Sequence, residues 1–135
     1  DPGYRLVAAA RAAGVTVSPI PGACALVAAL SASGLPTDRF CFEGFLPTKT
    51  GERRAALQAL KSEPRTMVFY ESPHRLKETL EDAAAIFGDQ REAALARELT
   101  KRFETILTLP LAALAQRVAQ DADQQRGECV LVVSG

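Results

Sequence analysis

The pattern of apolar and polar residues changes period repeatedly along the chain, between the spacing typical of helices and the alternation typical of strands. Helical spacing, often ended by a glycine or opened by a proline, predicts helices over residues 4–13, 23–33, 52–61, 73–87 and 110–120. Runs rich in β-branched, aromatic or alternating residues predict strands over residues 15–17, 40–46, 67–70, 91–100, 103–109 and 128–133. Such a mixture predicts an α/β protein.

The first third of the chain contains the predicted domain boundary. The helix at 23–33 consists almost wholly of small and apolar residues, so we expect it to be buried on every side. Such burial needs more protein than this part of the chain supplies. The turn residues from Leu35 to Asp38 separate two strongly patterned regions and form the most plausible linker. We therefore place the only boundary there, between residues 1–35 and 36–135.

The second half of the chain contains the signals of a sheet. Segments on both sides of Lys101 and Arg102 alternate between apolar and polar residues, which predicts an antiparallel hairpin that turns near these residues. The segment 128–133 is apolar enough to be a central strand. Within the strand at 40–46, Gly44 predicts a bulge or a close approach of another backbone.

The junction between the strand at 67–70 and the following helix is the main candidate site. The buried strand is predicted to stop at Glu71, with Ser72 as helix N-cap and Pro73 as the first helical residue. Polar and charged groups gather there, namely Tyr70, Glu71, His74 and Arg75. Open α/β sheets usually bind ligands at such strand ends. The alternative is that Glu71 and Arg75 only form an ion pair within a turn.

A second candidate is the segment from Pro19 to Ala25, which joins the predicted strand to a helix through residues with small side chains. Small side chains let a ligand approach the backbone, and the free N–H groups of a helix start can bind a polar or anionic group. Tight packing against a neighbouring element would explain the same pattern.

A third candidate is the charged hairpin tip from Arg97 to Glu104. Such a run is usually a solvated turn. Arg97, however, shares its predicted face with Leu95 and Leu99, and a half-buried arginine generally has a carboxylate or phosphate partner.

A fourth candidate is the group Lys49, Arg53 and Arg54, which lies at the start of a predicted helix. Positive charge there opposes the helix dipole unless an anion or a nearby acid compensates. Phosphate binding and simple pairing with Glu52 explain the pattern equally well.

Composition narrows the class of protein. The chain has 135 residues, 47% of them hydrophobic, and its Lys+Arg and Asp+Glu counts are both 16. These values fit one modest globular core, and the overall charge predicts no nucleic-acid partner, although a neutral chain can carry a local basic face. No stretch is apolar for long enough to cross a bilayer, and no signal peptide is present, so we expect no membrane association.

The cysteines and the single histidine show no metal-binding spacing. Cys24, Cys41 and Cys129 are far apart in apolar runs, so we expect buried thiols in a reducing compartment, and hence a cytoplasmic protein. His74 has no second imidazole or cysteine nearby, and we expect neither a metal site nor a Cys-His nucleophile pair. Because the chain begins on the turn sequence Asp-Pro-Gly rather than on Met, we expect a piece of a longer protein.

Several short motifs together resemble one enzyme family. They are Asp1-Pro2-Gly3, Pro19-Ile20-Pro21-Gly22-Ala23-Cys24-Ala25, Gly34-Leu35-Pro36-Thr37-Asp38-Arg39-Phe40, Gly44-Phe45-Leu46-Pro47, Phe69-Tyr70-Glu71-Ser72-Pro73-His74-Arg75, Ala96-Arg97-Glu98-Leu99-Thr100-Lys101 and Gly127-Glu128. Each motif is weak alone, but the set is specific because it runs in order along the whole chain. The sequence resembles the ribosomal small-subunit RNA 2′-O-methyltransferases built on the tetrapyrrole methylase fold.

This resemblance implies a fold, a cofactor and partners. Residues 1–35 would be the tail of an N-terminal cofactor-binding domain, and residues 36–135 a C-terminal domain with a mixed β-sheet flanked by helices. The family is dimeric, binds S-adenosylmethionine between its domains and methylates a cytidine of small-subunit ribosomal RNA, so we expect this fragment alone to be inactive. By position, the residues expected to contact the cofactor are Pro21, Gly22, Cys24, Ala25, Tyr70, Glu71, Glu128 and Cys129.

The implied reaction is an in-line displacement at a sulfonium carbon, in which positioning of the ribose oxygen should supply much of the rate. A 2′-hydroxyl is a poor nucleophile, which a carboxylate could deprotonate or a lysine polarise. The catalytic candidates, among which the sequence does not choose, are Glu71, Glu98 and Lys101. The residues expected to contact RNA are Lys49, Arg53, Arg54, Arg75, Arg97 and Lys101.

Two other functions stay open at this point. One keeps the fold and replaces RNA by a tetrapyrrole or another small molecule as methyl acceptor. The other is a non-catalytic module for RNA binding or dimerisation, since the expected N-terminal half of the cofactor site lies outside this sequence.

Overall fold

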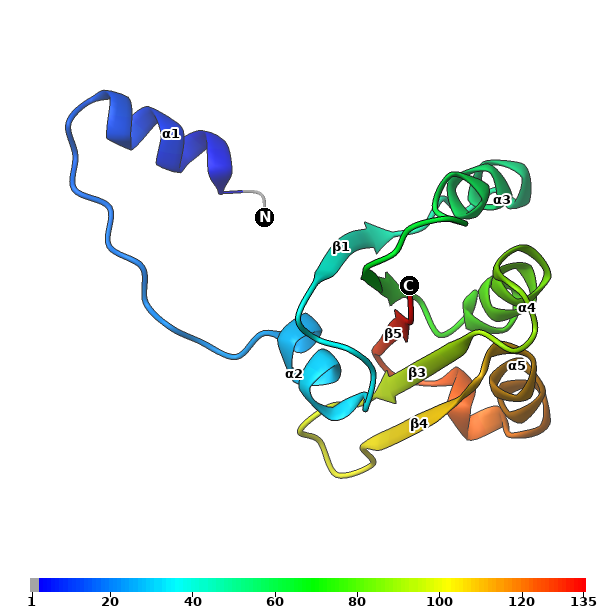
Figure 1. Ribbon diagram of the computed structural model, residues 1–135. Helices are drawn as coiled ribbons and strands as arrows, with labels where there is room; N and C mark the ends of the chain where they lie inside the picture. The colour runs from blue at the N-terminus through cyan, green and yellow to red at the C-terminus, as the bar shows by residue number, and fades with distance from the viewer. Residues whose placement is uncertain (1–2) are drawn as a thin grey trace.

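A mixed β-sheet organises the chain, of which the computed structural model describes residues 3–135 (Figure 1). The turn predicted at Asp1 and Pro2 lies outside the described residues. The strands are β1 (Phe40–Phe45), β2 (Thr66–Glu71), β3 (Glu92–Arg97), β4 (Thr105–Pro110) and β5 (Cys129–Val133). The helices are α1 (Tyr4–Ala12), α2 (Ala25–Ala32), α3 (Thr50–Ala59), α4 (Leu76–Phe87) and α5 (Leu111–Gln120), followed by the 3-10 helix η1 (Ala122–Gln125).

The sheet has the strand order β1-β2-β5-β3-β4. β1 runs parallel to β2, and every other neighbouring pair is antiparallel. β5 is buried along its whole length between β2 and β3, which confirms the predicted central strand, and β3 and β4 form the predicted hairpin. The C-terminal ends of β1, β2 and β3 therefore meet the N-terminal ends of β4 and β5. We call this side of the sheet its Glu71 end.

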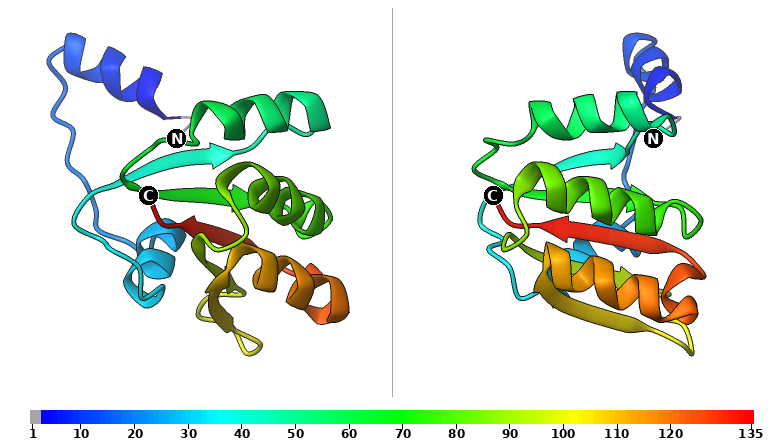
Figure 2. Two further views of the ribbon diagram at one scale, coloured as in Figure 1. Left: turned by 45° about the vertical axis from the view of Figure 1, so that its right-hand side comes forward. Right: turned by 90° about the vertical axis from the view of Figure 1, so that its right-hand side faces the viewer.

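Helices cover the two faces of the sheet unequally. Helices α3, α4 and α5 lie over one face, whereas α2 lies on the other (Figure 2). The larger core, under the three helices, includes Leu80, Leu114 and Leu131. The smaller core, under α2, includes Val68 and Val132. The α2 side of β1 is left uncovered, and its aromatic side chains are exposed, namely Phe40, Phe42 and Phe45.

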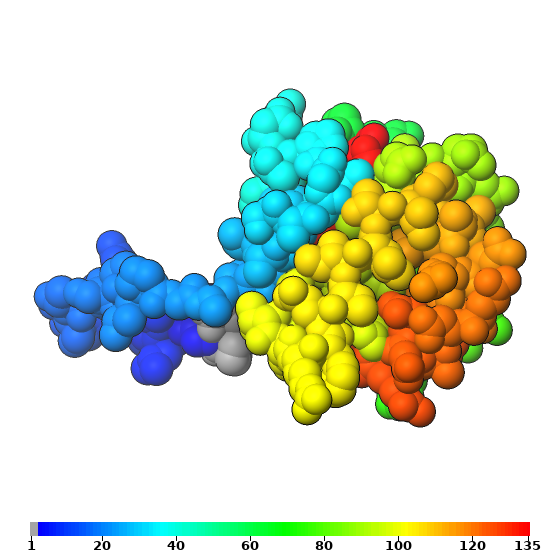
Figure 3. Space-filling view, turned by 90° about the horizontal axis from the view of Figure 1, so that it is seen from below, coloured from blue at the N-terminus to red at the C-terminus, as the bar shows by residue number. Residues whose placement is uncertain are grey.

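The N-terminal arm, residues 3–24, stands apart from the sheet (Figures 1 and 3). α1 has the predicted position, but none of its residues is buried, and Leu6 is 75% exposed. The strand predicted at 15–17 is wrong, because within residues 3–135 no other strand pairs with this extended segment. The predicted burial of α2 on every side is also wrong, since it packs Ala29 and Leu30 onto the sheet and leaves Val27 53% exposed.

The start of α4 differs from the prediction. Ser72 is not its N-cap and Pro73 is not its first residue, because a turn precedes the helix and Arg75 occupies the N-cap position. In this turn the Arg75 N–H donates to the Ser72 carbonyl at 3.0 Å. The Glu71 carboxylate holds both ends of the turn, because it accepts the Ser72 N–H at 2.6 Å and pairs with Arg75 at 3.1 Å.

The path of the chain after β3 also differs from simple alternation. Leu99 was predicted on the face of Leu95 but packs against the smaller core on the opposite side. The strand ends at Arg97, and Glu98 and Thr100 then take positive φ angles of 49° and 64°. Backbone in this left-handed region is costly for residues other than glycine, and such strain gathers at functional sites.

Ion pairs hold α3 against α4. Arg53 has a side chain only 2% exposed, and its Nε lies 2.7 Å from Asp82 Oδ2, while its Nη2 lies 3.3 Å from Glu78 Oε2. Arg54 Nε lies 2.7 Å from the other oxygen of Asp82. Burial alone would raise the pKa of Asp82, but the hydrogen bonds from Arg54 and Arg53 outweigh it and hold that pKa below its ordinary value. The acids that compensate Arg53 and Arg54 at this helix start therefore come from α4.

We predict that Asp82→Asn lowers the free energy of unfolding by about 3 kcal/mol, because it removes the nearer and only buried counter-ion of Arg53. Glu78→Gln is the control, since Glu78 is 63% exposed and its loss should cost within about 0.5 kcal/mol. Urea denaturation of the complete gene product measures both. Because the folded pKa of Asp82 is depressed, the gap between wild type and Asp82→Asn should narrow as pH falls below 3.8. An equal effect of the two variants would contradict this assignment.

Candidate functional site

A pocket of about 390 Å³ opens at the Glu71 end of the sheet, which we call the strand-end pocket. It is built where the end of β1, the end of β2 and the start of β5 meet the first residue of α2. Its lining residues are Ala25, Phe45, Tyr70, Glu71, Ser72, Pro73, Gly127, Glu128, Cys129 and Val130. Segments far apart in sequence thus form one concave surface, as expected of a ligand site at strand ends.

The apolar wall of the strand-end pocket depends on a bulge in β1. The pairing register shifts between Phe42 and Gly44, and Gly44 takes a φ of 70°, which confirms the predicted bulge. The extra residue turns Phe45 onto the same face as Tyr70, with ring centroids 5.8 Å apart. Phe45 remains 63% exposed and offers its ring to a ligand. Phe45 was not among the site residues predicted from sequence, although the bulge predicted at Gly44 could have indicated it.

The polar wall contains Glu71, which is only 4% exposed. Its carboxylate accepts hydrogen bonds from the Ser72 N–H and the Thr79 hydroxyl, and it forms an ion pair with Arg75 at 3.1 Å. The turn pairing of Glu71 with Arg75 that the sequence left open is therefore present. The same bonds fix the backbone of Ser72 at the pocket wall.

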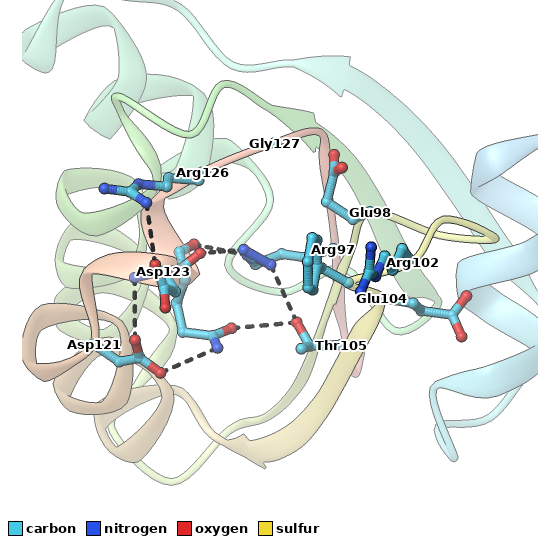
Figure 4. Close-up of a pocket in the computed structure, with 11 residues that line it drawn as sticks. Arg97, Glu98, Arg102, Glu104, Thr105, Asp121, Asp123, Arg126 and Gly127 are labelled. Carbon is cyan, nitrogen blue, oxygen red and sulfur yellow. Dashed lines mark hydrogen bonds and ion pairs between the residues drawn. The ribbon is translucent and has the colours of Figure 1, made fainter.

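A second, larger pocket of about 640 Å³ lies next to the first, and we call it the hairpin pocket. Residues of the β3–β4 connection and of the η1 region line it (Figure 4). They are Arg97, Glu98, Arg102, Phe103, Glu104, Thr105, Asp121, Asp123, Gln124, Arg126 and Gly127. Gly127 belongs to both pockets, so the two sites adjoin.

Arg97 crosses the hairpin pocket toward η1 (Figure 4). It is 5% exposed, and its guanidinium donates to the backbone carbonyls of Asp123 and Gln124 and to the Thr105 hydroxyl. The partner expected for this arginine was a carboxylate or a phosphate. The protein supplies carbonyl oxygens instead, so Arg97 holds the η1 turn against the sheet.

A charged cluster, Glu98, Lys101 and Glu128, stands between the two pockets. Lys101 Nζ lies 3.0 Å from Glu98 Oε1 and 2.9 Å from Glu128 Oε2, and Glu98 Oε1 also accepts the Glu128 N–H at 2.7 Å. The Glu128 N–H, together with Lys101, lowers the pKa of Glu98. Both carboxylates raise the pKa of Lys101, which keeps it protonated at neutral pH. The cluster can therefore present a fixed positive charge beside two carboxylates.

The structure brings together some of the residues predicted to bind cofactor and separates others. Those that line the strand-end pocket are Ala25, Tyr70, Glu71, Glu128 and Cys129. Pro21, Gly22 and Cys24 lie exposed in the arm and line neither pocket. Burial raises the pKa of the Cys129 thiol to about 11, so this thiol is neutral at ordinary pH.

The cations predicted to contact RNA fall into two groups. The side chains of Lys49, Arg54 and Lys101 are 80%, 63% and 47% exposed, and Arg75 is 28% exposed. Arg53 and Arg97 are buried, and protein groups occupy their guanidinium nitrogens. Lys49 pairs with Glu52 at 3.2 Å, as the simpler explanation of that group expected.

Among residues 3–135, no group of side chains could hold a metal ion.

No described helix has both the length and the apolar character needed to cross a membrane.

The fold and this sheet end define the class of protein. Residues 1–115 match the family Tetrapyrrole (Corrin/Porphyrin) Methylases, and the chain belongs to that family. Over all 135 residues it is 62% identical to ribosomal RNA small subunit methyltransferase I of Pseudomonas aeruginosa, and 55% identical to the protein of the same name from Escherichia coli O157:H7. The chain covers 48% and 47% of these relatives, about half their length.

Solved structures show the same fold. Uroporphyrin-III-C-methyltransferase from Thermus thermophilus superposes with a TM-score of 0.66 at 22% identity, covering 99% of this chain and 58% of that one. A structure of the Thermus thermophilus enzyme in complex with S-adenyl homocysteine superposes with a TM-score of 0.60 at 17% identity, covering 98% of this chain and 58% of that one. Together these matches confirm the predicted tetrapyrrole methylase fold.

We predict that Gly127→Ala destabilises the protein more than Gly34→Ala. The two glycines have similar φ angles of 77° and 74°, so each substitution should cost about 1–2 kcal/mol of backbone strain. A Cβ on Gly127 would also collide with the Glu98 carboxylate, whereas one on Gly34 meets nothing within 4 Å. The collision should add about 1 kcal/mol or more. Chemical denaturation compares them, and equal losses would show that Glu98 yields without cost.

Proposed function

We propose that the chain is part of an S-adenosylmethionine-dependent methyltransferase that methylates the 2′-hydroxyl of a cytidine in small-subunit ribosomal RNA. The observation that carries the proposal is the meeting of separate sequence motifs, at Tyr70, Glu71, Glu128 and Cys129, in one pocket. The names of the most similar relatives support RNA as the methyl acceptor. Because the chain covers about half of those relatives, the activity is proposed for the complete gene product.

The strand-end pocket suits S-adenosylmethionine. Phe45 and Tyr70 offer aromatic surface to an adenine ring, and the exposed Glu128 carboxylate can accept hydrogen bonds from ribose hydroxyls. The backbone of Gly127 at the pocket wall offers further polar groups. When bound, the cofactor supplies a methyl group on a positively charged sulfur. In this proposal the chain provides one wall of the cofactor site, and this chain alone binds cofactor weakly.

The charged cluster between the pockets carries the proposed catalysis. A protonated Lys101 stabilises the negative charge that develops on the ribose oxygen as the hydroxyl proton passes to solvent water. That oxygen then bonds to the methyl carbon as the carbon–sulfur bond breaks. Glu98 and Glu128 fix the position of the ammonium group. Glu98 and Glu71 remain candidate bases, but each already accepts hydrogen bonds from protein groups. Lys101 is therefore our first choice among the catalytic candidates.

Exposed cations contact the RNA in this proposal, namely Lys49, Arg54, Arg75 and Lys101. Arg53 and Arg97 act indirectly, since they hold α3 and η1 in place. We extend the proposal to a homodimer in the cytoplasm. Cys129 is buried as predicted, but the prediction of buried thiols is wrong for Cys24, which is exposed, and for Cys41, which is half-buried. All three thiols are nevertheless free, which fits a reducing compartment. The exposed aromatic side chains of β1 fit association with another protein surface.

Transfer of a labelled methyl group tests the function directly. The complete gene product is incubated with labelled S-adenosylmethionine and either small ribosomal subunits, naked ribosomal RNA or a tetrapyrrole. We expect label in RNA, in a nucleotide that resists alkaline cleavage because its 2′-oxygen is methylated. Label in the tetrapyrrole alone would establish the small-molecule alternative, and no label anywhere would favour a non-catalytic module.

We predict that Phe45→Ala weakens S-adenosylmethionine binding roughly tenfold, or about 1.4 kcal/mol, because the adenine loses its aromatic contact. Phe42→Ala is the matched control, since Phe42 is also exposed on β1 and meets the Tyr70 ring edge to face, as Phe45 does, but does not line the pocket. Isothermal titration calorimetry on the complete gene product gives both dissociation constants. Unaltered affinity in Phe45→Ala would remove Phe45 from the cofactor site.

We predict that Lys101→Met slows single-turnover methylation roughly 100-fold and changes the cofactor dissociation constant less than about twofold. The lost charge should matter for the reacting oxygen rather than for cofactor binding. Lys77→Met is the control, because Lys77 is a similarly exposed lysine on α4 whose partner, Glu81, lines neither pocket, whereas the partners of Lys101 line both. A parallel fall in rate for both lysines, or no fall for Lys101, would rule out this role.

A further inference from the structure

The hairpin pocket contains an exposed aromatic residue that none of the roles above uses. Phe103 lies in the connection between β3 and β4 and is 71% exposed. The guanidinium carbon of Arg102 sits 5.4 Å from the centre of its ring. A large apolar side chain in a charged tip has no packing role there, and an aromatic ring beside an arginine is a common platform for an unstacked nucleobase.

The polar lining of this pocket suits a base better than a run of phosphates. Its lining contains both arginines and carboxylates, so it is not a basic groove of the kind that follows a nucleic-acid backbone. Glu104 Oε1 accepts the Thr100 N–H, and Asp123 Oδ1 pairs with Arg126. In the described part of the chain, the second oxygen of each of these carboxylates has no protein donor. These oxygens can accept hydrogen bonds from the exocyclic amino group of a base.

The position of the hairpin pocket relates it to the proposed chemistry. It shares Gly127 with the strand-end pocket, and the cluster of Glu98, Lys101 and Glu128 lies between them. A nucleotide whose base occupies the hairpin pocket would therefore hold its ribose beside Lys101. A pocket of about 640 Å³ is large enough for one nucleotide.

We propose that the hairpin pocket binds the base of the RNA nucleotide that is methylated, with Phe103 stacked on the base and free carboxylate oxygens accepting its amino group. This inference rests on the proposed function and adds the substrate subsite to it. Phe103 is thereby a binding residue for the substrate, separate from the cofactor site.

The test combines a protein variant with an altered RNA, using the complete gene product. The methylated position is mapped first, and an RNA that lacks the base at that position is then prepared. Fluorescence anisotropy measures the affinity of both RNAs for wild type, Phe103→Ala and Phe103→Trp. Phe40→Ala serves as control, because Phe40 is an exposed aromatic residue at the start of β1, whereas the pockets lie at the Glu71 end of the sheet.

We expect Phe103→Ala to bind the intact RNA roughly tenfold more weakly, with the salt dependence of binding and the cofactor affinity unchanged. Phe103→Trp should bind as wild type does, and so should Phe40→Ala. For the RNA without the target base, wild type and Phe103→Ala should bind equally, since the stacking partner is already absent. A tenfold loss that persists with this RNA, or no loss with intact RNA, overturns the inference. If wild type methylates no RNA at all, the proposed function itself fails.

Discussion

The register of β5 against its two neighbours decides where the chemistry of this chain can lie. Cys129, its first residue, pairs with Glu71 of β2 on one side and with Arg97 of β3 on the other. The residues just before it, Gly127 and Glu128, must therefore pass between the ends of both neighbouring strands. Each pocket forms on one side of this crossing. A shift of β5 by one residue would turn its side chains to the opposite faces and separate the groups that now meet.

Much of this arrangement could be predicted from sequence, because the spacing of apolar residues in β2, β3 and β5 agrees with the burial of these strands. The apolar runs of β2 and β5 favour the interior of a sheet, where both faces of a strand are buried. The alternation of apolar and polar residues on both sides of Lys101 predicts a hairpin. The strand-end rule pointed to Tyr70 and Glu71, whereas Glu128 was expected in the site only from the family resemblance. The place of Phe45 in the pocket could not be predicted in this way. The face to which its side chain points depends on the extra residue of the bulge, and the alternation of residues does not show where a bulge shifts the register.

Other predictions failed where tertiary contacts replaced a local rule. Ser72 has the chemistry of an N-cap, yet the Glu71 carboxylate holds Ser72 and Arg75 in a turn, and the helix begins only after it. Val15 to Val17 have strand propensity, but a strand also needs a partner, which residues 3–135 do not offer. Arg53 and Arg97 have the charge expected of RNA contacts. Both are buried, and their guanidinium groups hold elements of the fold together instead. Sequence pattern does not reveal this role, because the acids and carbonyls that they bind lie far away in the sequence.

The charge balance between the two pockets has a consequence for turnover. Lys101 offsets one of its two neighbouring carboxylates, so the cluster with Glu98 and Glu128 retains one net negative charge. S-adenosylmethionine carries a sulfonium cation, and it loses that charge when the methyl group leaves. Coulombic attraction to the cluster thus favours the donor over its spent form. In the proposed mechanism, the residues that position the ribose oxygen would in this way also help the spent cofactor to leave and a new one to bind.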